Sequence, residues 1–174
     1  MNEDMGYDPR AICNAILDMA ERLQIEVSNL SLNKILFFAH AHWLANFRRR
    51  LCALSFEAWQ YGPVVPLIYH QFKHHGNNVI ASRATKIDFE TGEDVKVEYA
   101  DLELDFDFLQ SIVSEYGSYS SGKLVQLSHI DGGAWHHVWN SSPEQKFGMV
   151  IPDSLIARTF DGSMPRSSDR RYVH

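Results

Sequence analysis

Apolar residues recur every three or four positions through much of the chain, which is the spacing of one face of an α-helix. The first series follows Asp8-Pro9, where an acidic cap and a proline at the first helical position are typical of a helix start. The second, longer series follows Ser31, which can cap it, and Phe38 and Leu44 widen its apolar face. We therefore expect this second helix at the centre of the core. The two series consist of Ile12, Ile16, Met19 and Leu23, and of Leu32, Ile35, Leu36, Ala39, Trp43 and Phe47.

The same spacing continues downstream. Proline is typical of helix starts, and glycine or asparagine often ends a helix because both tolerate the left-handed conformation. These features predict helices from Pro66 to Gly76-Asn77, from Leu102 to Tyr116, from Ser120 or Ser121 to Gly132-Gly133, and from Pro152 to Phe160, with a short turn at Trp135–Trp139.

Two segments have the period-two pattern of strands. Residues 54–61 alternate in this way, and Gly62-Pro63 is expected to break the chain after them. Residues 86–99 alternate around a turn at Thr91-Gly92-Glu93, which predicts a β-hairpin. Because two strands alone are marginally stable, the hairpin must pack on the helices. The predicted fold is mainly α with a small β-hairpin (α+β), a compact bundle of about six or seven helices.

The length of 174 residues suits one domain with a substantial core. We find no internal repeat and no long linker. After Gly162 the sequence is almost free of apolar residues. The predicted organisation is a flexible amino terminus over residues 1–8, a single domain over 9–161 and a disordered tail over 162–174.

The net charge of −6 makes a nucleic-acid partner unlikely, because phosphate binding normally needs a broad Lys/Arg surface. Arg48-Arg49-Arg50 is the one dense basic run, and it suits the carboxyl end of a helix. Cys13 and Cys52 form no CxxC pair and are expected to be free, buried thiols. With no signal peptide and no membrane-spanning stretch in the sequence, we expect a cytoplasmic protein.

Nine histidines raise the possibility of a metal site. His70 and His74 are four residues apart on the third helix, but the glutamate of an HExxH motif is absent between them. The sequence also lacks a GxSxG elbow and a glycine-rich phosphate loop. These patterns favour a protein that binds another protein over an enzyme, and we expect no metal site and no cofactor.

Two groups of residues have both a structural and a functional interpretation. The first is acidic: it can be the solvated start of a helix or a surface that steers a basic partner. The second is aromatic: its members can fill the core or anchor an interface, and the core is the more common case. The groups are Glu98, Asp101, Glu103, Asp105 and Asp107, and Trp59, Tyr61, Trp135 and Trp139.

Four blocks of the sequence form a recognisable pattern. They are Leu32–His40, Phe56–Pro66 with Tyr69, Phe72, His75 and Gly76, Leu124–His129 with Gly133-Ala134-Trp135, and Val150-Ile151-Pro152 with Ile156 and Phe160. Together they resemble the Panacea domain family of phage-associated GepA-like proteins and SocA-like antitoxins. The resemblance covers about residues 10–160. It departs from the family pattern at His40-Ala41-His42 and at Gly122-Lys123, which concerns local packing and partner choice.

The resemblance implies an antitoxin, often prophage-associated, that binds and blocks a cognate toxin protein, typically the product of an adjacent gene. Toxins of such pairs differ widely and include translation inhibitors and small alarmone synthetases. The resemblance supplies no catalytic residues. It implies a scaffold motif of Trp59, Tyr61, Gly62, Pro63, Pro66, Tyr69, His129 and Trp135. We therefore expect partner recognition on the hairpin, on neighbouring helix faces and on the acidic residues Glu98, Asp101, Glu103, Asp105 and Asp107.

Two alternatives remain open at this point. The chain could be a phage-encoded interaction protein that modulates a host factor without any toxin. It could also be a metal-dependent hydrolase that uses His70, His74 and a third histidine.

Overall fold

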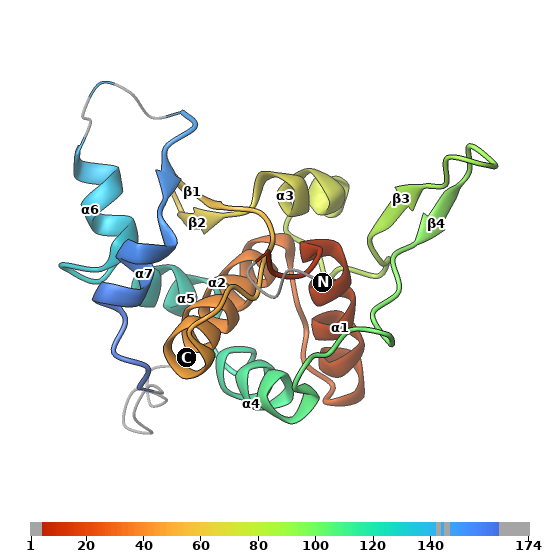
Figure 1. Ribbon diagram of the computed structural model, residues 1–174, viewed down its shortest axis with the longest axis horizontal. Coiled ribbons are helices and arrows are strands. Elements are labelled where there is room, and N and C mark those ends of the chain that lie inside the picture. The colour runs from red at the N-terminus through yellow and green to blue at the C-terminus, as the bar shows by residue number, and fades with distance from the viewer. Residues whose placement is uncertain (1–4, 142–143, 145–146, 164–174) are drawn as a thin grey trace.

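The computed structural model describes residues 5–141, 144 and 147–163 (Figure 1). Within these ranges seven α-helices and two small antiparallel sheets are present, which confirms the mainly α fold with a small β-hairpin. The helices are α1 (Pro9–Arg22), α2 (Asn29–Phe47), α3 (Pro66–Phe72), α4 (Phe106–Tyr116), α5 (Ser121–Ser128), α6 (Ala134–Ser141) and α7 (Asp153–Thr159), and a 3₁₀-helix, η1 (Lys73–His75), follows α3.

Helix α2 lies in the middle of the fold (Figure 1), as its long apolar series predicts. It contacts α1, α3, α4, α5 and α7, so it is enclosed on nearly all sides. Its residues are buried almost without interruption from Asn29 to Trp43. A helix enclosed in this way is apolar around most of its circumference, which is why the predicted single face understates its burial.

The structure corrects three predictions about the helices, and the first two concern the residues at which helices begin. Ser28, not Ser31, caps α2: the Ser28 Oγ accepts from the Ser31 N–H, while the Ser31 Oγ accepts from the Ser28 N–H at 2.8 Å. Helix α4 begins at Phe106 rather than Leu102, because the Asp105 carboxylate accepts from the Phe108 N–H at 2.8 Å and so caps it there.

The third correction concerns the segment after α5. Ser120 caps α5, as expected, and its Oγ accepts from the Lys123 N–H at 3.2 Å. The predicted short turn at Trp135–Trp139 is instead the eight-residue helix α6. Its indole rings and Val138 pack against the core on one side, so tertiary contacts extend a turn into a helix.

The first sheet has the strand order β2-β1-β5 and consists of β1 (Phe56–Trp59), β2 (Gly62–Val64) and β5 (Val150–Ile151). The predicted break at Gly62-Pro63 is wrong, because these residues begin β2 and pair antiparallel with Trp59 and Ala58. Gly62 adopts a φ of +106°, which turns the chain directly into the second strand. Pro63 is tolerated because β2 is an edge strand.

The second sheet is the predicted hairpin, formed by β3 (Thr85–Ile87) and β4 (Asp94–Lys96), and it projects from the helical body (Figure 1). The register pairs Lys86 with Val95 and Ile87 with Asp94. Ile87 and Val95 therefore lie on opposite faces of the hairpin, because paired residues share a face and neighbours alternate.

The chain ends fall partly outside the described residues, which is where most of the expected tail over 162–174 lies. Near the other end, Tyr7 forms a parallel bridge with Cys52, and its hydroxyl donates to the Glu103 carbonyl oxygen at 2.7 Å. Cys13 and Cys52 are buried and free, as predicted. Arg48 ends α2 in a left-handed conformation, and the Arg50 guanidinium lies 2.6 Å from the Asp153 carboxylate.

Candidate functional site

Three segments meet at a buried lysine, and we call this place the Lys34 junction: Lys34 of α2, Gly62 and Pro63 of β2, and Ser128 at the end of α5. The Lys34 side chain is completely buried, and its Nζ donates to the Pro63 carbonyl oxygen at 3.0 Å. A Cβ built on Gly62 would lie 2.6 Å from both the Lys34 Cε and the Ser128 Oγ. Only glycine therefore fits at this position.

The junction continues into α6 through stacked rings. The His129 ring lies on the Trp135 indole with centroids 3.5 Å apart and planes 5° from parallel. The Trp135 Nε1 donates to the Trp59 carbonyl oxygen at 2.8 Å, which ties α6 to the turn between β1 and β2. Tyr69 of α3 meets the Trp59 ring edge to face at 5.0 Å. These contacts therefore join α3, β1, the end of α5 and α6 beside the Lys34 side chain.

Burial governs the protonation of this junction. It lowers the pKa of Lys34 to about 7, because no described carboxylate forms an ion pair with its amine. Burial also lowers the pKa of His129, and the neighbouring Lys34 charge lowers it further. The amine is enclosed by backbone and side chains at 0% exposure, which leaves a substrate no approach. The junction is therefore suited to hold the fold together rather than to catalyse.

The structure distributes the eight residues of the scaffold motif unevenly. Gly62, Pro63, Trp59, His129 and Trp135 gather at or beside the junction. Tyr69 joins them through its contact with Trp59, and Pro66 begins α3. Tyr61 stands apart, because it is 61% exposed in the turn between β1 and β2.

Sequence reasoning missed the polar residues at the centre of this arrangement. Lys34 and Asn33 interrupt the apolar series of α2, and that interruption was the available sign of a buried polar role. The Asn33 Oδ1 accepts from the Val65 N–H at 3.2 Å, just before α3 begins. Ser128 carries no comparable sign, since serine is common at helix ends.

The two histidines that depart from the family pattern are both buried and bonded. The His40 Nδ1 accepts from the Cys52 N–H at 3.2 Å, so its Nε2 carries the proton and donates to Asp153 at 3.0 Å. The His42 Nε2 lies 2.8 Å from the Tyr116 hydroxyl, and burial lowers the His42 pKa to about 4. Both imidazoles therefore serve packing within α2 and its neighbours.

The histidines proposed for a metal site do not form one. Helix α3 ends at Phe72, so His74 lies in η1 and not one helical turn beyond His70 on a continuous face. In the described part of the chain, no group of three or more His, Cys, Asp or Glu side chains could hold a metal ion.

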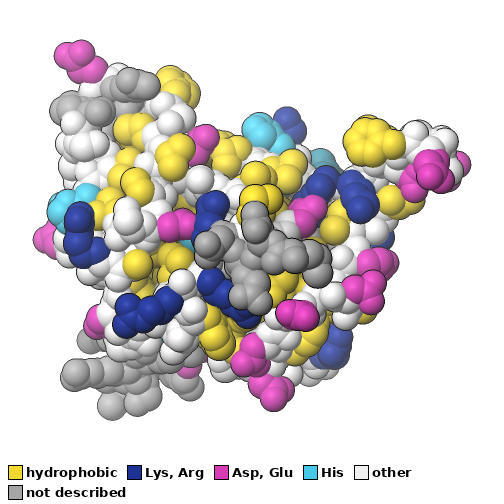
Figure 2. Space-filling view, viewed as in Figure 1, with side chains coloured by type: hydrophobic (Ala, Val, Ile, Leu, Met, Phe, Trp, Pro, Cys, Tyr) yellow, Lys and Arg dark blue, Asp and Glu magenta, His cyan; other side chains and the backbone are white. Residues whose placement is uncertain are grey.

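The five acidic candidates lie on an exposed stretch from the hairpin into the first turn of α4, where Asp107 lies. We call this stretch the acidic segment: Glu98, Asp101, Glu103, Asp105 and Asp107. All five are exposed, and Asp105 is also the cap of α4. Figure 2 shows acidic side chains from the hairpin down towards α4 on one side of the molecule. These side chains are therefore exposed along one stretch of the surface, and they do not line a common pocket.

Charge is concentrated on this part of the chain. Residues 86–107 hold nine of the 22 acidic residues but only two of the 16 basic ones, which gives a net charge of −7. The remaining thirteen acidic and fourteen basic residues nearly cancel. The whole negative charge of the protein, −6, therefore comes from the hairpin and the acidic segment.

The hairpin is fastened to the body at its base, and we call residues 84–97 the arm. The buried Asn14 side chain of α1 accepts from the Ala84 N–H at 2.7 Å and donates to the carbonyl oxygens of Ala84 and Val97 at 3.0 and 2.8 Å. The Asp18 carboxylate, one turn further along α1, accepts from Arg83 and from the Tyr99 hydroxyl, both at 2.6 Å. The arm is therefore held in a defined direction.

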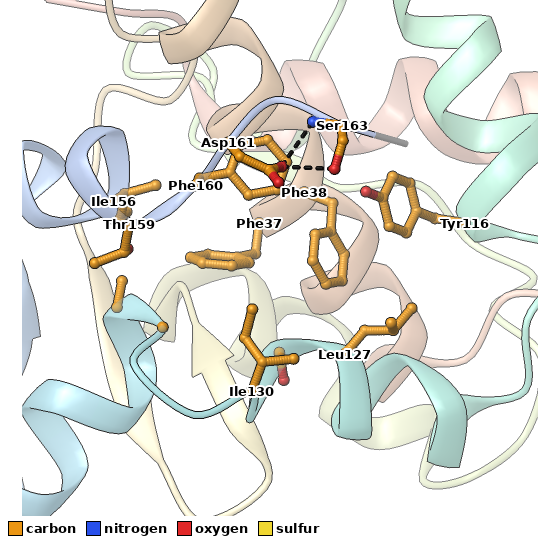
Figure 3. A pocket seen from close by; sticks show the side chains of 13 residues that line it. Phe37, Phe38, Tyr116, Leu127, Ile130, Ile156, Thr159, Phe160, Asp161 and Ser163 are labelled. Atoms are coloured by element: carbon orange, nitrogen blue, oxygen red, sulfur yellow. Dashed lines mark hydrogen bonds between the residues drawn. The ribbon is translucent and has the colours of Figure 1, made fainter. Parts of the chain in front are cut away.

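A separate hollow of about 230 Å³ opens between α2, α4, α5 and α7 (Figure 3). Phe37, Phe38 and Ile130 point into it, and Phe38 stacks on Tyr116 with ring centroids 4.3 Å apart. At its mouth the Asp161 carboxylate accepts from the Ser163 N–H and hydroxyl at 2.8 and 2.6 Å. Its lining is mainly aromatic and aliphatic.

Comparison with known proteins decides the family. The model of the antitoxin SocA-like, Panacea domain matches residues 32–136. The chain is also 35% identical to Antitoxin SocA of Caulobacter vibrioides over 159 residues, which covers 91% of this chain and 85% of that protein. This chain belongs to the SocA-like Panacea domain family.

The family match coincides with the features described above. Its range of 32–136 begins two residues before Lys34 and ends one residue after Trp135, so it contains the whole Lys34 junction, the arm and the acidic segment. Helices α1 and α7 lie outside it. The search of solved structures gives no significant match. Among the described residues, no helix is both long enough and apolar enough to cross a bilayer.

Proposed function

We propose that this Panacea domain protein is the antitoxin of a toxin–antitoxin pair and neutralises its toxin by binding it directly, without catalysis. The observation that carries the proposal is the 35% identity to Antitoxin SocA across nearly the whole chain. The toxin is the protein product of an adjacent gene, and both act in the cytoplasm. No cofactor takes part.

The charge distribution supports direct binding to a basic protein. A net charge of −7 on 22 consecutive residues, beside a nearly neutral remainder, creates a one-sided field. Such a field steers a partner of opposite charge and raises the association rate more than the affinity. The arm and the acidic segment are therefore the proposed contact surface, with Glu98, Asp101, Glu103, Asp105 and Asp107 in the steering role.

The Lys34 junction supports a proposal in which buried residues hold the fold together and a separate, projecting surface binds the partner. It fixes the relative positions of α2, β2, α5 and α6, because the buried Lys34 and Trp135 side chains donate to backbone carbonyl oxygens of the first sheet. A surface that projects from such a scaffold can change its side chains without disturbing the fold, because interface energy depends on few anchors. This arrangement suits a family whose members bind different toxins.

Co-expression tests the proposal. The product of the adjacent reading frame is induced in cells with this chain or with a version that carries an early stop codon. We expect growth arrest with the truncated version and normal growth with the intact chain, together with a complex of the two proteins on a gel-filtration column. A neighbour that is harmless alone, or equally toxic with the intact chain, would contradict the antitoxin role. Capture of one abundant host protein instead would favour the host-factor alternative.

A further inference from the structure

The tip of the arm presents an aromatic side chain entirely to solvent. Phe89 follows β3 and is 100% exposed, and Ile87, two residues earlier, is 59% exposed. Figure 2 shows hydrophobic and acidic side chains next to each other on the projecting hairpin. A phenylalanine in water forgoes the favourable free energy of burial, so its full exposure at the tip of the arm calls for an explanation.

The fold of the tip does not need this phenylalanine. The Asp88 carboxylate accepts from the N–H groups of Glu90 and Thr91 at 2.8 and 3.1 Å, and the Asp88 N–H donates to the Glu93 carbonyl oxygen at 2.8 Å. Gly92 supplies the positive φ of +73° that the turn requires. The backbone of the turn is thus satisfied by its neighbours, and the Phe89 ring takes no part in it.

The register of the arm also leaves one apolar residue unpartnered. Ile87 pairs with Asp94, and so it lies on the face opposite to Val95. A shift of one residue would place Ile87 and Val95 on the same face, where they could pack together. In the observed register Val97 is buried at the base while Ile87 stays exposed.

The arm is built to hold this tip in place. Asn14 makes three hydrogen bonds to its base, and Asp18 binds both flanks through Arg83 and Tyr99. Because the arm is already ordered in the free protein, a partner need not supply the free energy of ordering it. Fixed presentation of an aromatic ring is the property expected of a binding anchor.

We propose that Phe89 is the principal anchor of the toxin interface, inserted together with Ile87 into an apolar pocket of the toxin that is ringed by Lys and Arg. The inference rests on the proposed antitoxin function and specifies the partner surface. The apolar pocket follows from the exposed ring and the basic rim from the flanking Glu90, Glu93 and Asp94, all of which are exposed. A desolvated aromatic centre inside a charged rim is the usual arrangement of a protein interface.

The charges of the arm disfavour two other occupants. A nucleic acid would bring phosphates against Asp88, Glu90, Glu93 and Asp94, and the repulsion would oppose binding. A second copy docked arm to arm would bring together two arms that each carry four carboxylates and two lysines, a net charge of −2 each. A basic protein surface meets neither obstacle.

The test measures binding of the full-length chain to the product of the adjacent reading frame, the probe used in the co-expression experiment, by surface plasmon resonance. We expect Phe89→Ala to weaken the affinity by at least 30-fold, mostly through faster dissociation. Phe147→Ala is the matched control, because Phe147 is also an exposed phenylalanine, at 87%, but lies far along the chain between α6 and β5. It should change the affinity less than twofold.

The outcomes separate the inference from the function on which it rests. If the wild-type chain binds and neutralises its neighbour while Phe89→Ala binds within twofold, the anchor is wrong and the antitoxin role stands. An equal loss in Phe147→Ala also overturns the anchor. If the wild-type chain does not bind the neighbour, both proposals fail. Sedimentation of the free chain adds one check, since a dimer dispersed by Phe89→Ala would show that the tip binds a second copy instead.

Discussion

The Lys34 junction and the arm both rely on buried polar side chains, but they use them for opposite purposes. At the junction, Lys34 is enclosed and holds neighbouring segments together through a single carbonyl oxygen. At the base of the arm, Asn14 uses its amide to hold a hairpin that then leaves the body. The Lys34 contact joins segments within the core, whereas the Asn14 contacts support a hairpin that projects from it.

The two regions also differ in how much change they can absorb. A single extra carbon at Gly62 would collide with Lys34 and Ser128, whereas Gly92 in the turn of the arm has no atom within 4 Å of an added Cβ. Both glycines have positive φ, of +106° and +73°. Substitutions at this turn therefore meet solvent, and substitutions at the junction meet the core, which suits the proposed use of the arm as a contact surface.

The largest expected effect separates the two glycines. Gly62→Ala should destabilise the protein by about 3–5 kcal/mol, because backbone strain adds to the collision with Lys34 and Ser128. Gly92→Ala carries the strain alone and should cost about 1 kcal/mol. Urea unfolding of the two variants and the wild type measures both values. Equal losses would show that the junction is not packed around Gly62.

A second prediction concerns the charge at the junction. Burial lowers the pKa of Lys34 to about 7, while the unfolded chain binds this proton up to its ordinary pKa near 10.4. Between these values the unfolded state holds more protons, so stability rises with pH at up to about 1.4 kcal/mol per unit. Below pH 7 both states are protonated and this contribution is constant.

Lys34→Met isolates that contribution, since methionine nearly preserves the volume and cannot titrate. The difference in unfolding free energy between Lys34→Met and wild type should change by roughly 2 kcal/mol between pH 7 and 9, to the advantage of the wild type at high pH. Chemical denaturation across that range gives the measurement. Parallel curves would mean that Lys34 keeps an ordinary pKa and is therefore not enclosed as described.

A third and smaller effect tests the base of the arm. Asn14→Ala removes three hydrogen bonds and leaves the Ala84 N–H without its acceptor, so we expect a loss of about 2 kcal/mol. Amide exchange over residues 84–97 should speed up more than exchange in α2. Asn46→Ala is the control, because this residue is exposed and its side chain donates to the His42 carbonyl oxygen of its own helix. Uniform acceleration across the protein would contradict a local role.

The sequence predicted the helical elements better than their junctions, for a physical reason. Apolar spacing depends on neighbours three or four residues away, so α1, α2 and α4 were visible in it, apart from the exact starts of α2 and α4. Strand β2 was not visible, because Gly62-Pro63 is usually a break and becomes a strand only when β1 and α2 lie beside it. The formation of β2 therefore depends on long-range packing, which the local spacing of apolar residues does not reveal.

The candidate site divides in the same way. Family motifs marked Gly62, His129 and Trp135 as scaffold residues. They also included Lys34 within the block Leu32–His40, but its buried role was not predicted, because a charged residue within a helix is normally expected at the surface. The alternation over 86–99 predicted the hairpin but not its register. Consequently the sequence could not show that Ile87 and Val95 lie on opposite faces.

The smallest expected effect on stability concerns two residues of the acidic segment. It tests whether this exposed region can change without disturbing the fold. Asp101→Lys with Glu103→Lys should change the unfolding free energy by less than about 0.5 kcal/mol, because both side chains are exposed and neither makes an ion pair among the described residues. The same change should slow association with the toxin by roughly tenfold at low salt and much less at high salt, because screening shortens the range of the field. Stopped-flow mixing at two salt concentrations measures both rates. If the two substitutions instead change the dissociation rate, and salt does not alter that change, these carboxylates lie inside the interface and do not act by long-range steering.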